Sequence, residues 1–245
     1  MTPATSPAKP SATSAAPASA ATSTRARLLC GVLAGPLFLV VGFAQVLTRD
    51  GFDLTRHALS LLSNGHLGWI QIGNFLVTGL LTIAAAVGMR RVLGRGPGGT
   101  WGPWLVGVYG TGLVCAGVFR ADPADGFPPG TPAGQGAVSW HGVLHMVSFG
   151  VGFLCLIAAC FVVARGLAAL GQPRSAVLSR SSGLVILAGV AASFATAGSA
   201  TAVAAVYVAV VVAWSWLAVM AARLTTELPD PTGSLNAETE PTSST

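Results

Sequence analysis

Charged residues are scarce in this sequence: Asp, Glu, Lys and Arg together make up 9% of its 245 residues. An ordinary soluble domain carries about 25% charged residues. No stretch between Leu28 and Ala222 is long and polar enough to form a water-exposed domain. The scarcity excludes a typical soluble enzyme. With 52% hydrophobic residues and a mean hydropathy of +0.69, the chain is predicted to be an all-α, polytopic membrane protein.

Lysine is nearly missing, since Lys9 is the single lysine among 13 basic residues. Arginine in place of lysine, together with abundant Ala, Gly and Pro, indicates a bacterial genome rich in G and C. The formal net charge is +5, but the basic residues are scattered at the ends of apolar runs. In such positions they orient a membrane protein, so no nucleic-acid partner is expected.

The sequence also lacks any pair of cysteines that would form a redox motif, because no CxxC spacing occurs. All cysteines fall inside apolar runs and none in a predicted outer loop, where an oxidising compartment would allow a disulfide. They are therefore predicted to be small core residues: Cys30, Cys115, Cys155 and Cys160.

Long apolar runs are what the sequence does have. A bilayer core needs roughly 20 apolar residues in a helix, and four runs satisfy this length. The uncharged stretch 181–222 is about twice as long as one span requires, so it is predicted to form a hairpin that turns at 197–200. The prediction is one bundle of six transmembrane helices within residues 25–223, with spans at 28–47, 69–89, 101–119, 140–164, 181–197 and 201–222.

The basic residues predict the orientation of this bundle, because cytoplasmic loops carry an excess of Lys and Arg. If the N-terminus is cytoplasmic, the outer side holds only Arg49, Arg56 and Arg120, and all other basic residues lie inside. We therefore expect a multi-pass protein of the cell (inner) membrane with both termini in the cytoplasm. Residues 1–24 and 224–245 are polar and poor in large apolar side chains, so both are predicted to be disordered cytoplasmic tails.

Polar side chains are unevenly distributed in this topology, because every histidine falls in the outer loops or at the outer ends of spans. Two spans carry polar or small residues at helical spacing. Polar groups rarely face lipid, so both stripes are predicted to face the bundle interior, where they could face each other. The stripes are Gln71, Asn74, Thr78 and Thr82 in the second span, and His141, His145, Ser148, Gly152 and Cys155 in the fourth.

The two outer loops differ in their predicted structure. In the first, Asp53 is suited to begin a helix and Asn64-Gly65 to end it, which predicts a short amphipathic helix over 54–63. Its polar face would carry Arg56, Ser60 and Ser63, with His57 beside them. The second outer loop, residues 120–139, is rich in Pro and Gly and is predicted to form a shaped turn that caps an outward-facing cavity.

These segments resemble the bacterial membrane family called domain of unknown function 998. The resemblance spans about residues 28–222 and implies a six-helix membrane protein, without implying any catalytic role. It lies in the residues Arg56-His57-Ala58-Leu59-Ser60-Leu61-Leu62-Ser63, Gly68-Trp69-Ile70-Gln71, Asn74-Phe75, Phe119-Arg120-Ala121-Asp122-Pro123, Gly126, Pro128, Ser139, His141-Gly142 and His145.

The leading hypothesis for function is an integral membrane protein of unassigned activity, with a polar site on its extracytoplasmic side that binds lipid headgroups or a small ligand. Arg56 and Arg120 could together bind a phosphate headgroup. Simpler roles are an Arg120–Asp122 ion pair and interhelical hydrogen bonds from the second span. The ligand-binding candidates are Arg56, His57, Ser60, Gln71, Asn74, Arg120 and Asp122.

Two alternatives belong to other classes. A metal-dependent hydrolase or transferase would act on lipid at the outer leaflet, with zinc held by His141 and His145 together with His57 or His66 and Asp122. The i, i+4 spacing of His141 and His145 favours it, but no HExxH glutamate is present, and hydrogen bonding to neighbouring helices would also explain these histidines. A transporter or permease is disfavoured by the absence of internal repeats and of mid-span charges. The sequence gives no indication of oligomeric state.

Overall fold

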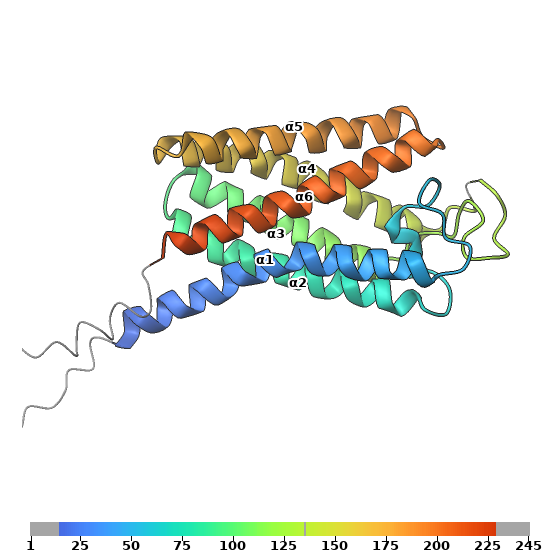
Figure 1. Ribbon diagram of the computed structural model, residues 1–245, viewed down its shortest axis with the longest axis horizontal. Coiled ribbons are helices and arrows are strands. Elements are labelled where there is room, and N and C mark those ends of the chain that lie inside the picture. Colours follow the sequence, from blue (N-terminus) through green and yellow to red (C-terminus); the bar gives the residue numbers. More distant parts are fainter. Residues whose placement is uncertain (1–14, 135, 229–245) are drawn as a thin grey trace, which may run out of the picture.

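The computed structural model describes residues 15–134 and 136–228. In this part of the chain, six α-helices and one short 3-10 helix are the regular elements (Figure 1). They are α1 (Ala15–Thr48), η1 (Leu59–Ser63), α2 (Gly68–Leu93), α3 (Pro97–Val118), α4 (Trp140–Ala169), α5 (Pro173–Ala195) and α6 (Ala200–Thr226). The predicted all-α bundle of six helices is therefore confirmed.

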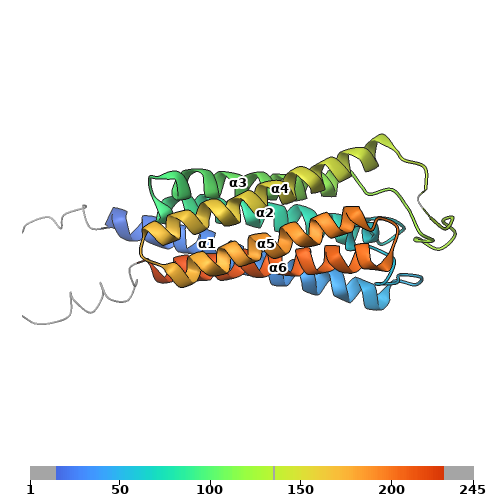
Figure 2. The ribbon, with the colours of Figure 1, turned by 90° about the horizontal axis from the view of Figure 1, so that it is seen from above.

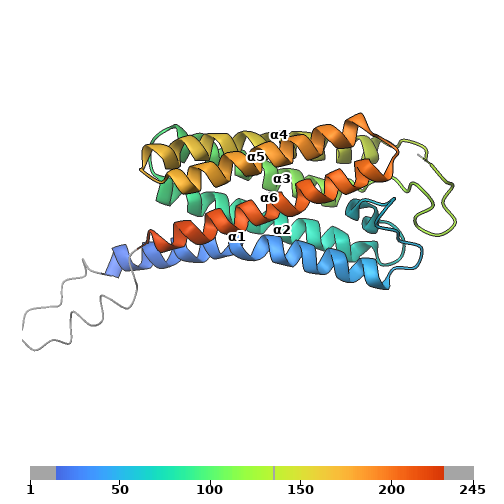
Figure 3. The same cartoon turned by 45° about the horizontal axis from the view of Figure 1, so that its top comes forward.

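The helices form a closed ring in chain order. Each packs against the next, and α6 closes the ring by packing against α1 as well as α5 (Figure 3). Loop 49–67 and the described residues of loop 119–139 lie together at one end of the bundle, which we call the loop end (Figure 1). The first residues of α1 and the last of α6 lie at the opposite end, the terminal end.

The lengths and apolar surfaces of these helices make the chain an integral membrane protein. Within the described residues, five helices are long and apolar enough to cross a bilayer, and α3 is the exception. Its first turns contain glycines, Trp101 and Trp104, which lower its hydropathy, yet α3 lies between α2 and α4 in the ring. Trp69 and Trp140 at the loop end, and Trp101 and Trp104 at the terminal end, are all more than 60% exposed. Tryptophans at both ends of a bundle are typical of the two membrane interfaces.

The predicted boundaries need correction at both termini. Helix α1 begins at Ala15, so the prediction of disorder is wrong for residues 15–24; residues 1–14 lie outside the described part of the chain. Alanine has the highest helix propensity, and this segment is rich in it. The side chain of Arg91 on α2 also donates to the hydroxyls of Ser23 and Thr24, both at 3.4 Å. Likewise α6 continues to Thr226, while residues 229–245 lie outside the described residues.

The hairpin turn between the last two helices lies where the sequence placed it. Helix α5 ends at Ala195 and α6 begins at Ala200. Ser199 precedes α6, and its hydroxyl accepts a hydrogen bond from the Ala202 amide at 3.2 Å. Such a cap satisfies one of the amides that a helix start leaves unpaired.

A buried hydrogen-bond chain joins three helices near the terminal end. The indole Nε1 of Trp216 on α6 donates to the hydroxyl of Ser179 on α5 at 2.9 Å, and that hydroxyl donates to the backbone oxygen of Cys160 on α4 at 2.7 Å. Trp216 and Ser179 are 1% and 0% exposed. The one hydroxyl therefore satisfies a tryptophan that has no water to bind.

We expect Ser179→Ala to lower the free energy of unfolding by about 1–2 kcal/mol, because it leaves the buried indole N–H without an acceptor. The measurement is the melting temperature of the detergent-purified protein. Ser181→Ala is the matched control, since Ser181 lies on the same helix but is exposed. Equal melting temperatures for the two variants would contradict the expected role of the chain.

Candidate functional site

A cavity of about 770 Å³ occupies the loop-end half of the ring. Its walls are formed mostly by apolar side chains of α3, α4 and α6, and the loops cover its end. The volume lies in the range of typical ligand pockets, about 300–1,000 Å³. Apolar wall residues include Leu113, Ala116, Val143, Met146, Phe149, Val203, Val206 and Val210.

The floor of the cavity is aromatic and lies near the middle of the helices. Tyr109 contacts both Phe153 and Trp214, with ring centroids 5.7 and 5.9 Å apart. The cavity lining runs from Gly142 to Phe153 on α4. At about 1.5 Å per residue, this corresponds to a depth of about 16 Å. One leaflet of a bilayer core is about 15 Å thick, so the cavity is as deep as one leaflet.

One side of the cavity opens between α4 and α5. The loop-end half of α4 diverges from α5 (Figure 2), whereas the two helices pack closely further down, where Cys160 lies next to Gly183. Lining side chains on both helices are exposed: Met146 on α4 by 54% and Phe194 on α5 by 60%. The opening therefore faces sideways, toward the space that lipid occupies in a membrane.

Four polar residues line the cavity at the loops: Arg56, Ser60, Asp122 and Asp125. We call this set the mouth. The guanidinium of Arg56 donates through Nη2 to the backbone oxygen of Asp125 at 2.8 Å. The Asp122 carboxylate accepts from the amide and the hydroxyl of Ser139, at 2.8 and 2.5 Å. The mouth thus carries charges of both signs on the two loops.

The carboxylate of Asp122 is fixed by the start of α4. The hydroxyl of Ser139 accepts from the Gly142 amide at 3.1 Å and so caps the helix while it donates to Asp122. A side chain at position 142 would collide with this carboxylate. The predicted Arg120–Asp122 ion pair is not formed, because Asp122 is turned to Ser139. Arg120 is exposed and does not belong to the described lining.

His57 lies beneath the mouth and is 2% exposed. Its Nδ1 accepts from the Asp53 amide at 2.9 Å, and its Nε2 lies 2.9 Å from the backbone oxygen of Asp125. An amide only donates and a carbonyl only accepts, so the ring is neutral with its proton on Nε2. Both nitrogens are therefore used, and His57 links the two loops.

The predicted helix over 54–63 is wrong. Only Leu59–Ser63 is helical, as the 3-10 element η1, and the backbone at Ala58 is extended. The side chains of Arg56 and His57 reach across to the other loop, so tertiary bonds outweigh the local helix pattern. Asp53 does begin a turn, because its backbone oxygen accepts hydrogen bonds from the amides of Arg56 and His57. Hydrogen bonds from Thr55, chiefly from its amide, lower the pKa of the Asp53 carboxyl.

The loops have a small core of their own, formed by Arg49, Phe52, His57 and Phe127. Phe52 and Phe127 meet edge to face with centroids 5.1 Å apart, and the Arg49 guanidinium lies 5.3 Å from the Phe127 ring centre. Arg49 also donates to the backbone oxygens of Leu62 and Asn64, at 3.3 and 2.6 Å. Burial lowers the pKa of Arg49. We call these four residues the loop core.

Among the described lining residues, His145 is the one histidine. Its Nδ1 lies 3.1 and 2.9 Å from the backbone oxygens of Ala116 and Phe119, at the end of α3. Two carbonyl acceptors require the proton on Nδ1. In the neutral ring, Nε2 is then left with a lone pair that can accept a hydrogen bond.

The structure does not bring the four metal-ligand candidates together. His57 uses both ring nitrogens, Asp122 is bonded to Ser139, and His141 stacks on Trp140 with centroids 3.6 Å apart. Across the described ranges, no three His, Cys, Asp or Glu side chains are grouped closely enough to hold a metal ion.

The polar stripe of α2 faces α1, not the mouth. Gln71, Asn74, Thr78 and Thr82 are all at most 5% exposed. Gln45 on α1 donates to the Gln71 side chain at 2.9 Å, and Asn74 donates to the Phe38 backbone oxygen at 3.1 Å. The stripe of α4 faces α3 instead, through His145 and Gly152. The two stripes therefore do not meet. Gln71 and Asn74 form contacts between α1 and α2, and neither is among the described lining residues of the cavity.

Sequence reasoning missed Asp125, Tyr207 and the aromatic floor. The hydroxyl of Tyr207 on α6 donates to the His57 backbone oxygen at 2.9 Å, which connects the first loop to the last helix. The chain has 2 tyrosines, and this one stands in a run of Ala and Val. A single tyrosine in such a run usually has a buried hydrogen-bond partner, so the sequence did contain a signal for Tyr207.

A ring of six membrane helices around a cavity with polar loops defines the class: a polytopic helical membrane protein. The chain belongs to the family described as "Protein of unknown function (DUF998)", whose sequence model matches residues 32–223. The resemblance drawn from the loop and span residues is thereby confirmed. No curated protein and no solved structure matches the chain.

Proposed function

We propose that this protein binds a membrane lipid at its loop end, with an acyl chain in the cavity and the headgroup at the mouth. The observation that carries the proposal is the match between cavity depth and leaflet thickness. Apolar walls extend for about 16 Å and end on the floor of Tyr109, Phe153 and Trp214. Acyl chains are held by such walls because burying apolar surface is favourable.

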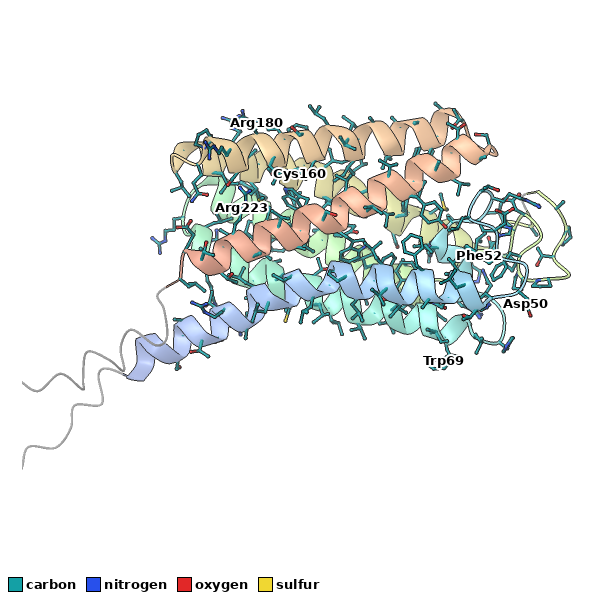
Figure 4. The ribbon with its side chains drawn as sticks, in the orientation of Figure 1. Asp50, Phe52, Trp69, Cys160, Arg180 and Arg223 are labelled. Atoms are coloured by element: carbon teal, nitrogen blue, oxygen red, sulfur yellow. The ribbon has the colours of Figure 1, made fainter. Side chains whose placement is uncertain are left out.

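The distribution of basic residues supports the outer leaflet as the source of this lipid. Arg180 and Arg223 lie toward the terminal end, whereas Asp50 and Phe52 lie at the loop end (Figure 4). An excess of arginine marks the cytoplasmic side. The proposal therefore places the terminal end in the cytoplasm and the loop end outside the cell membrane.

The sideways opening supports the same assignment. A lipid that enters between α4 and α5 keeps its chain in an apolar environment throughout, so no step exposes it to water. The exposed Met146 and Phe194 border this path. The mouth lies at the level where a headgroup would stay hydrated.

The test is to fill the cavity. Val210 lines the cavity, so Val210→Trp is expected to reduce the lipid retained per protein by about tenfold. The indole would displace several methylenes of the acyl chain, each worth about 0.8 kcal/mol of burial. Their sum exceeds the roughly 1.4 kcal/mol that corresponds to a tenfold change in affinity. Retained lipid is measured by mass spectrometry of the protein purified in mild detergent.

Val208→Trp is the matched control, because Val208 lies on the same helix, is 51% exposed and is not among the described lining residues. It should retain lipid like the wild type. Val206→Phe is a second lining variant, and it should also reduce the retained lipid if the effect of Val210→Trp is not a folding defect specific to position 210. Equal lipid retention by the lining variants and the control, with all of them folded, would overturn the proposal.

A further inference from the structure

The charges at the mouth are separated, not paired with each other. Arg56 is bonded to the backbone oxygen of Asp125 and not to its carboxylate. Within residues 15–134 and 136–228, no hydrogen bond reaches the Asp125 carboxylate or the Nη1 and Nε atoms of Arg56. A guanidinium with free donors and a carboxylate with free acceptors therefore lie on the same rim.

The other arginines of the loop end are not available to a ligand in the cavity. Arg49 is 8% exposed and donates to Leu62 and Asn64 in the loop core. Arg120 is exposed and lies outside the described lining. Arg56 thus shares the cavity lining with two aspartates, Asp122 and Asp125.

We propose that the lipid is a zwitterionic phospholipid with a primary ammonium, whose phosphate binds Arg56 and whose ammonium binds Asp125. This inference rests on the proposed function. A guanidinium offers the planar set of donors that suits phosphate oxygens, and an ammonium suits an unpaired carboxylate. An anionic headgroup without an amine would bring its charge beside Asp122 and Asp125 with only Arg56 to offset it.

The position of Asp122 strengthens this selection. Its carboxylate is held in place by two hydrogen bonds from Ser139 and cannot move without breaking them. The mouth therefore keeps a fixed negative charge besides that of Asp125. Charge complementarity of this kind acts on specificity more than on total affinity. A change at the mouth is therefore expected to alter the ratio of bound headgroups more than the total amount of lipid bound.

The experiment offers the full-length protein in detergent equal amounts of phosphatidylethanolamine and phosphatidylglycerol with identical chains. Bound lipid is then counted by native mass spectrometry. We expect the wild type to favour phosphatidylethanolamine by about fivefold, the range of a partly exposed ion pair. Asp125→Asn should bring the ratio close to one without lowering total lipid bound. Arg56→Gln should lower binding of both phospholipids but not of diacylglycerol, which lacks phosphate.

The Asp125→Asn exchange suits this position, because residue 125 has a φ of 54° and asparagine tolerates left-handed backbone as well as aspartate does. Asp50→Asn is the matched control, an exposed loop carboxylate outside the described lining. It should leave the ratio unchanged.

The outcomes separate the two proposals. If lipid binds and Val210→Trp abolishes binding, but the wild-type ratio is near one or favours phosphatidylglycerol, the headgroup assignment is overturned and the acyl-chain cavity stands. An unchanged ratio in Asp125→Asn overturns the assignment to that carboxylate. If neither lipid binds the wild type, both proposals fail.

Discussion

Gly79→Leu should destabilise the protein by about 3 kcal/mol or more, as expected for overpacking against rigid neighbours. A Cβ atom at position 79 of α2 would lie 2.8 Å from the Gly110 backbone oxygen on α3 and 3.0 Å from the Val114 backbone nitrogen. Both obstacles are backbone atoms, so the helices themselves would have to separate. The contact is reciprocal, since a Cβ at Gly110 would lie 2.9 Å from the Gly79 oxygen. Small residues allow such close approach between membrane helices.

The matched control is Gly73→Leu on the same helix, because a Cβ at position 73 meets nothing within 4 Å. It should melt at or slightly above the wild-type temperature, since leucine has the higher helix propensity. The measurement is thermal unfolding in detergent, followed by monodispersity on gel filtration. If Gly79→Leu and Gly73→Leu have the same melting temperature, the α2–α3 contact is looser than the distances indicate.

Arg49→Met should lower the free energy of local unfolding of the loop end by about 2–4 kcal/mol. The guanidinium donates to the backbone oxygens of Leu62 and Asn64 at the end of η1 and lies against Phe127. Methionine fills part of the space but supplies no donor, so two carbonyls that were bonded to a charged group lose it. Lysine would not replace it, because an ammonium cannot reproduce the planar fork.

The loop end, not the whole bundle, should show the effect of Arg49→Met. We expect the rate of proteinase K cleavage within residues 49–67 and 119–139 to rise at least about tenfold, because cleavage follows the population of the locally open form. Arg120→Met is the control, since Arg120 is exposed. Equal cleavage of both variants would show that the loop core does not depend on Arg49.

The polar residues of the spans and of the loops were not equally predictable. The spacing of Gln71, Asn74 and Thr78 placed them on one helix face, and membrane burial of polar groups made that face interior; all three are buried. The sequence also singled out His57 and His145 as candidate site residues. It did not reveal that their ring nitrogens would lie against backbone oxygens of other elements. For His57 that partner is 68 positions away.

The loops show why local pattern fails at this site. Residues 54–63 have apolar and polar positions at helical spacing, but Arg56 and His57 gain more by reaching Asp125 on the second loop. A helix of this length is marginal in isolation, so a few cross-loop hydrogen bonds decide its conformation. The second loop, predicted to be a shaped turn, supplies those acceptors.

The six helices, the turn before α6 and the burial of the α2 stripe could be predicted from the sequence alone. These depend on local quantities: the length of an apolar run against bilayer thickness, and the 3.6-residue period of a helix. Contacts between distant segments account for the rest: the ring closes through α6 and α1, α4 diverges from α5, and a cavity one leaflet deep ends on Tyr109, Phe153 and Trp214. The physical reason is that a cavity is set by contacts between distant segments, and no single run of residues encodes the space its neighbours leave.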